Sequence, residues 1–86
     1  MINSIVEITE HICQRFIERI NPNLLSITDY NMRLRAAENA IKAILKEANY
    51  ISDDKRGVLL RHETSKCDLI VQNRKLLTIY TTKKSK

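Results

Sequence analysis

The apolar positions in the first quarter of the chain recur every three or four residues, which is the period of an amphipathic helix. They are Ile5, Ile8, Ile12, Phe16 and Ile20. Ser4 has a glutamate three residues further on, the spacing of a capping box, so the helix is predicted over residues 4–20. Thr9 is a competing N-cap; if it is used, residues 4–8 form an extended lead-in to a shorter helix. Pro22 ends the helix in either case.

A second, longer helix is predicted over residues 29–49. Its apolar side is formed by Tyr30, Leu34, Ala37, Ile41, Ile44, Leu45 and Ala48. Five alanines in this segment favour the helical state and permit close packing. We expect the N-cap at Ser26 or Thr28, with Asp29 in or beside the first turn, where its charge complements the helix dipole.

Beyond residue 49 the apolar positions change to the pattern of strands. Residues 52–57 have the composition of a turn. Three short runs of β-branched and long aliphatic residues follow, at residues 58–63, 67–72 and 75–82. The connections between these runs are so short that the strands must form antiparallel hairpins, which predicts a three-stranded β-meander.

These elements predict a single α+β domain, with two N-terminal helices packed on one face of a three-stranded antiparallel sheet. A chain of 86 residues is too short for two domains. Alternation along the last strand places on one face Leu76, Thr78, Tyr80 and Thr82. We assign this face to the open side of the sheet, and the opposite face, with Leu77 and Ile79, to the helices.

Charge narrows the choice of partner. The chain has 15 Lys and Arg residues against 10 Asp and Glu residues, for a net charge of +5. A surplus of this size on a small domain suits the phosphate backbone of a nucleic acid, and we interpret the partner as RNA. A soluble protein that happens to be basic is the alternative interpretation.

The cysteines and the apolar runs bear on the cellular compartment. Cys13 lies in a helical pattern and Cys67 in a strand pattern, so nothing indicates a disulfide framework. The apolar runs are too short for a secretory signal or a membrane span. We therefore expect a cytoplasmic protein that does not enter a membrane.

No metal or cofactor is expected from the residue spacing. The possible soft ligands are His11, Cys13, His62 and Cys67. No pair of them has the spacing that presents two ligands from one knuckle or one helix face. Gly57 is the single glycine, and one glycine cannot build a phosphate-binding loop.

Two helical rows carry candidate chemistry. His11, Arg15 and Arg19 stand four residues apart on one side of the first helix, where a histidine beside arginines can act as acid or base next to a bound phosphate. The polar side of the second helix carries cations that can contact phosphates, among them Arg35, Lys42 and Lys46. A solvated polar face is the alternative interpretation of both rows.

The strands carry a third group of candidate functional residues. Arg61 and Glu63 share one strand face, His62 lies on the other, and Lys66 follows in the turn. If Arg61 faces the open side, it joins the hydroxyls of the last strand, where a tyrosine can stack on a base and threonines can bond a phosphate. A charged sheet edge, and the ordinary preference of Thr and Tyr for strands, are the alternatives.

The order of these features resembles the barnase/EndoU/colicin/RelE-like superfamily of toxins and ribonucleases. The resemblance rests on the pattern His11-x-x-x-Arg15-Phe16-x-Glu18-Arg19 and on the final run Leu76-Leu77-Thr78-Ile79-Tyr80. It implies metal-independent RNA cleavage, with His11 as acid or base, and with Arg15 and Arg61 stabilising the developing charge. It further implies that Thr78 and Tyr80 position the phosphate.

Three kinds of function follow as hypotheses. A toxin-type endoribonuclease requires its four catalytic candidates to converge, namely His11, Arg15, Arg61 and Tyr80. A non-catalytic nucleic-acid-binding module requires a broad basic face without that cluster, and the residues expected to bind are Arg19, Arg35, Lys42, Lys46, Lys66, Thr78 and Thr82. A phage-type or antitoxin-like inhibitor of another protein requires an apolar patch or an exposed strand edge. Such an edge, at residues 58–62 or in the last strand, is also a possible route to a homodimer.

Overall fold

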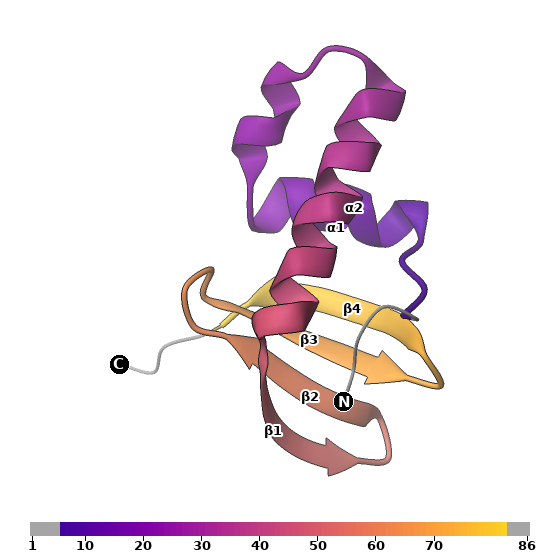
Figure 1. The fold of residues 1–86 in the computed structure, drawn as a ribbon, viewed down its shortest axis with the longest axis vertical. Helices are drawn as coiled ribbons and strands as arrows, with labels where there is room; N and C mark the ends of the chain where they lie inside the picture. Colours follow the sequence, from indigo (N-terminus) through magenta and orange to yellow (C-terminus); the bar gives the residue numbers. More distant parts are fainter. Residues whose placement is uncertain (1–5, 83–86) are drawn as a thin grey trace.

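The computed structural model describes residues 6–82 as two α-helices, a short 3₁₀ helix and a four-stranded antiparallel sheet (Figure 1). The elements are α1 (Glu10–Arg19), η1 (Pro22–Ser26), α2 (Tyr30–Glu47), β1 (Asn49–Asp54), β2 (Gly57–His62), β3 (Cys67–Gln72) and β4 (Lys75–Thr81). The strands lie in the order β1-β2-β3-β4. The α+β class and the antiparallel meander are confirmed, but the prediction of three strands is wrong.

The missed strand is β1, which the sequence pattern had divided between the end of a helix and a turn. Helix α2 ends at Glu47, and Ala48 is already extended, with ψ of 149°. All six residues of β1 are exposed, so the strand has no apolar alternation to reveal it. It is held instead by antiparallel pairing with β2, from Asn49 opposite Arg61 to Asp54 opposite Gly57.

Helix α1 starts at the later of its two candidate caps. The Thr9 hydroxyl accepts a hydrogen bond from the Ile12 backbone N–H at 3.3 Å, which places Thr9 at the N-cap. Glu7 is extended and pairs with the start of β4, because its N–H bonds the Arg74 carbonyl at 2.7 Å and its carbonyl accepts from Leu76 at 3.0 Å. Ser4, the other candidate, lies outside the described residues.

The N-cap of helix α2 is neither of the two predicted residues, Ser26 and Thr28, but the next residue along the chain. The Asp29 carboxylate accepts a hydrogen bond from the Met32 backbone N–H at 3.0 Å, so Asp29 is the N-cap itself. Ser26 belongs to η1, which connects the two α-helices. None of the helices in residues 6–82 is long and apolar enough to cross a membrane.

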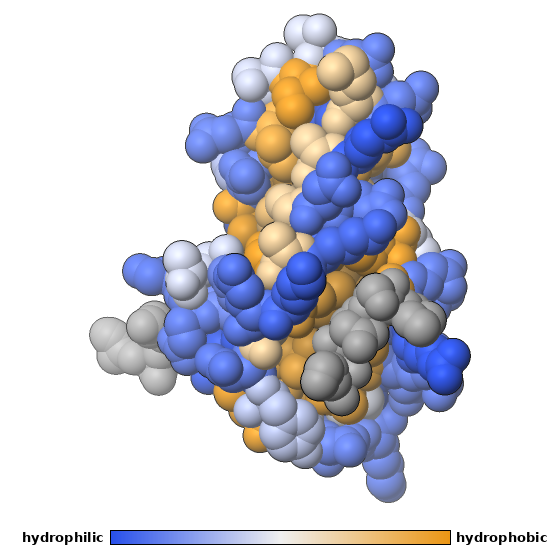
Figure 2. Space-filling view, viewed as in Figure 1, coloured by the Kyte–Doolittle hydropathy of each residue, from blue (hydrophilic) through white to orange (hydrophobic). Residues whose placement is uncertain are grey.

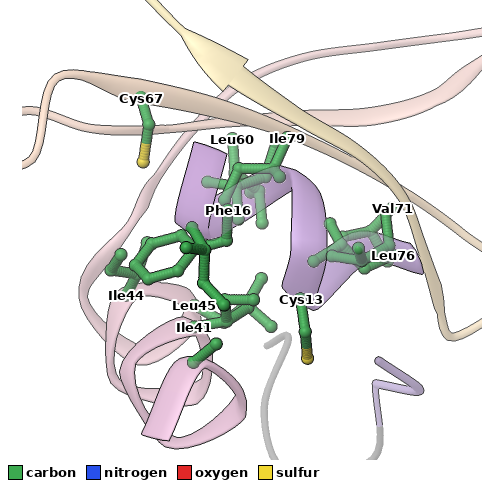
Figure 3. Close-up of a cluster of buried hydrophobic side chains, with 14 residues drawn as sticks. Cys13, Phe16, Ile41, Ile44, Leu45, Leu60, Cys67, Val71, Leu76 and Ile79 are labelled. Atoms are coloured by element: carbon green, nitrogen blue, oxygen red, sulfur yellow. The ribbon is translucent and has the colours of Figure 1, made fainter. Parts of the chain in front are cut away.

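Both helices cover the same face of the sheet. Helix α1 packs along β4, and the C-terminal part of α2 packs over β2, while the N-terminal part of α2 extends beyond the sheet (Figure 1). Phe16 from α1 lies between sheet residues such as Leu60 and Ile79 and the buried side of α2 (Figure 3). The core therefore sits between the helical layer and one sheet face, and the other face is open.

A β-bulge in β4 changes which residues reach the core. Val71 pairs with Leu76, whereas Ile70 pairs with Thr78, so Leu77 is an extra residue in β4. Leu76 is therefore buried on the helical side, and Leu77 is exposed. The predicted positions of these two leucines are wrong for this reason, whereas Ile79 faces the helices as predicted.

Candidate nucleic-acid interface

A row of three polar residues crosses the open face of the sheet. Asp68 on β3 pairs with Arg61 on β2 and with Tyr80 on β4. Residues paired in this way share a face, and the strand neighbours Leu60, Leu69 and Ile79 belong to the helical core. The prediction that Tyr80 lies on the open face is thus confirmed, and Arg61 joins it there.

Asp68 organises this row. Asp68 is 5% exposed, and its carboxylate accepts two hydrogen bonds from Arg61, from Nε at 2.8 Å and from Nη2 at 3.0 Å. The Thr82 hydroxyl donates a third hydrogen bond at 2.7 Å. A buried carboxylate with three donors fixes its partners in place, so the Arg61 guanidinium is held at a defined position on the sheet.

The guanidinium of Arg61 has a second edge that Asp68 does not use. Arginine has five N–H donors in a planar fork, and the two bonds to Asp68 take one side of that fork. A small pocket of about 140 Å³ adjoins Arg61, and its other lining residues are Glu63, Lys66 and Thr82. The Thr82 N–H bonds the Lys66 carbonyl at 2.9 Å, so the β2–β3 turn and the end of β4 form the pocket walls.

Stability should depend on pH through Asp68. The hydrogen bond from Arg61, assisted by the one from Thr82, holds the pKa of the Asp68 carboxyl below its usual value, although burial acts in the opposite direction. A lowered pKa in the folded state adds stability that is complete above the unfolded value of about 3.9 and is lost as the pH falls below it. Asp68→Asn should therefore lower the unfolding free energy at pH 7, and this deficit should shrink under acid.

Urea unfolding at stepwise lower pH measures this difference. Asp53→Asn, at an exposed position on β1, is the matched control and should show a smaller deficit at neutral pH. A deficit for Asp68→Asn that stays constant down to the acid limit would show that the carboxylate charge does not stabilise the fold.

The other two catalytic candidates lie elsewhere. Arg15 donates from Nε to His11 Nε2 at 3.3 Å, and Arg19 in the same row donates to the Ile79 carbonyl at 3.4 Å. This row belongs to α1, in the layer that covers the opposite face of the sheet from Arg61 and Tyr80. The four catalytic candidates therefore do not form one cluster, because His11 and Arg15 lie on α1 while Arg61 and Tyr80 lie on the open face of the sheet, on either side of Asp68.

The cations of α2 form a third, separate surface. Arg35, Lys42 and Lys46 are exposed, and Lys42 is paired with Glu38 at 3.4 Å. Figure 2 shows hydrophilic residues in a ridge along α2, on the outer side of the helical layer. These cations do not join the open sheet face, which brings together only Arg61, Lys66, Thr78, Tyr80 and Thr82 among the predicted residues.

Asp68 is the residue of this row that the sequence patterns did not single out. An acidic residue inside a strand that is otherwise apolar is itself a signal, because a buried carboxylate needs donors. The predicted strands 58–63 and 67–72 would place Asp68 opposite His62, whereas in the structure His62 pairs with Cys67 and Asp68 therefore lies opposite Arg61. The first clue was present in the sequence, and the register was not.

The remaining reactive groups have structural surroundings. His62 is buried on the helical side, with Nε2 at 2.8 Å from Glu47 and Nδ1 accepting from the Ser65 N–H at 3.2 Å. Cys13 and Cys67 are free and buried, and burial raises the pKa of the Cys67 thiol to about 11, which disfavours the reactive thiolate. Within residues 6–82, no three His, Cys, Asp or Glu side chains are grouped to hold a metal ion.

Comparison of the chain with protein-family models, with curated proteins and with solved structures gave no match.

Proposed function

We propose that this chain is a non-catalytic nucleic-acid-binding domain and that it binds through the open face of its sheet. The observation that supports this proposal is the grouping of Arg61, Lys66, Tyr80 and Thr82 around the buried Asp68. The ribonuclease hypothesis has no comparable support, because its acid or base candidate, His11, lies across the sheet from Arg61 and Tyr80.

The residues grouped around Asp68 would contact different parts of the nucleic acid. Tyr80 is half-buried, so its ring is anchored while one side remains available to stack on an unpaired base. The free edge of the Arg61 fork can bond two oxygens of one phosphate, and its orientation is already fixed by Asp68. Lys66 adds charge at the same pocket, and the sequence after Thr82 continues with Lys83, Lys84 and Lys86.

This arrangement recognises single-stranded nucleic acid by stacking and by backbone charge, with little sequence readout. Tyr80→Leu removes the stacking ring and is expected to weaken binding about 5- to 150-fold, which corresponds to roughly 1–3 kcal/mol per stacked base. The measurement is fluorescence anisotropy with labelled single-stranded RNA and DNA of one sequence, and the two titrations show whether the 2′-hydroxyl matters. Tyr30→Leu, at the end of α2 that lies away from the sheet, is the matched control.

A salt series separates the open sheet face from the surface of α2. Lys66→Gln should reduce the slope of log affinity against log salt by about 1, because one phosphate contact is lost. Lys46→Gln removes an equally exposed lysine on α2 and should leave the slope unchanged. The opposite pattern would place the binding surface on α2 and would contradict the proposal.

The same protein, incubated with RNA in excess EDTA, tests the absence of catalysis. RNA is expected to remain at full length. Cleavage that disappears in a folded His11→Ala variant would support the ribonuclease hypothesis instead.

A further inference from the structure

The two edges of the sheet differ in how well they are covered. At the β4 edge, Glu7 pairs with the first residues of the strand, and Arg19 donates to the Ile79 carbonyl. At the β1 edge, no strand of the described chain pairs with the outer side of β1. An open edge is a template for a further strand, and proteins normally cover it or break it up.

The exposed strand β1 also carries apolar side chains. Tyr50 is 63% exposed and Ile51 is 42% exposed, so two of the six large hydrophobic residues on the surface of the described chain lie on this short strand. Apolar side chains next to unpaired backbone groups are the combination that a partner strand would cover.

We propose that β1 is a docking surface for a second copy of this chain, with the two β1 strands antiparallel across a two-fold axis. This inference goes beyond the proposed function and does not depend on it. The partner is identified by the self-complementarity of β1, which rests on its register with β2 and on its charges.

The bulge in β1 determines the register. Tyr50 pairs with Leu60 and Asp53 pairs with Val58, so Tyr50 and Asp53 point to the same side of the sheet, although an unbulged strand would put them on opposite sides. Antiparallel partners across a strand pair must share a side. Tyr50 of one copy can therefore lie opposite Asp53 of the other.

The outer residues of β1 also share a side of the sheet with their partners in this register. Asn49 and Asp54 share the open side of the sheet, since their β2 partners Arg61 and Gly57 lie two strand periods apart. Asn49 of one copy then faces Asp54 of the other. A bulge usually protects an edge strand from pairing, but here the two bulges meet at the centre of the pair and leave the flanking residues in register.

The charges disfavour one alternative register. A pair centred on Asp53 would set two aspartates opposite each other, which is destabilising. In the proposed register each aspartate faces an uncharged residue.

Cross-linking tests the register directly. The native Cys13 and Cys67 are buried, so introduced surface thiols dominate disulfide formation. Tyr50→Cys and Asp53→Cys variants are each oxidised alone and as an equimolar mixture. The mixture is expected to give several-fold more disulfide-linked dimer than either variant alone, because only unlike positions lie opposite each other and a disulfide requires Cα atoms closer than about 7 Å.

Sedimentation equilibrium tests the association itself. The unmodified chain should show concentration-dependent dimers, and Ile51→Lys should shift it to monomer. Leu77→Lys, which adds the same charge at an exposed leucine on β4, should leave the dimer intact. A chain that sediments as a monomer at every concentration, or a mixture that cross-links no better than the single variants, would overturn the proposal.

Discussion

Phe16→Ala is expected to lower the free energy of unfolding by about 3–5 kcal/mol. The Phe16 ring is 2% exposed and fills the space between α1, α2 and the sheet (Figure 3). Its removal leaves a cavity that three elements would have to close together. Because small domains have a total stability of about 5–15 kcal/mol, much of this chain should be unfolded by moderate urea, and circular dichroism during urea titration measures the loss.

Two further variants make the result specific to packing. Phe16→Leu keeps part of the buried volume and should cost clearly less than Phe16→Ala. Met32→Ala truncates an exposed side chain on α2 and should change stability by no more than about 0.5 kcal/mol. Equal losses for Phe16→Ala and Met32→Ala would contradict the arrangement of the core.

Gly57→Ala should destabilise the fold by about 2 kcal/mol or more. Gly57 begins β2 with φ of +126°, a conformation that residues with a side chain rarely adopt. A Cβ atom there would lie 2.5 Å from the backbone oxygen of Val71 on the neighbouring strand, so β2 and β3 would have to separate.

The sign of the change in unfolding free energy shows whether the backbone at Gly57 is strained. Replacing glycine with alanine at an unstrained position stabilises a protein by about 0.4–1 kcal/mol through the unfolded state. Thermal unfolding of Gly57→Ala beside Arg56→Ala, at the exposed neighbouring position, distinguishes the two cases. A higher melting temperature for Gly57→Ala would show that β2 and β3 do not approach each other as described.

Periodicity predicted the elements that bury an apolar side. Helix α2 and strands β2, β3 and β4 each have one, and their positions agree with the sequence pattern to within a few residues. Strand β1 buries nothing, so only backbone pairing defines it. The bulge at Leu77 was equally hidden, because one extra residue in a strand reverses the alternation without changing the composition.

The strand residues of the candidate site could be predicted from the alternation of side chains along each strand. Alternation places Tyr80 and Arg61 each on one face of its strand. The short hairpins then determine whether the two residues lie on the same face of the sheet. No such rule connects α1 with the sheet, because the side of the sheet on which a helix packs depends on the tertiary fold. The helices were predicted to pack on the face opposite Tyr80, so the separation of His11 from Tyr80 follows from that assignment and conflicts with the convergence that the resemblance implied.

The order of the strands has a consequence for synthesis of the chain on the ribosome. Each strand pairs with the next one along the sequence, so every hairpin can form as soon as its second strand emerges. The contact between α1 and β4 is different, since Arg19 and Ile79 are 60 residues apart. At about 5–20 residues per second, the side of α1 that packs on β4 waits roughly 3–12 s for its partner. During that interval it is open to chaperones and to neighbouring nascent chains, and α2 can cover only part of it.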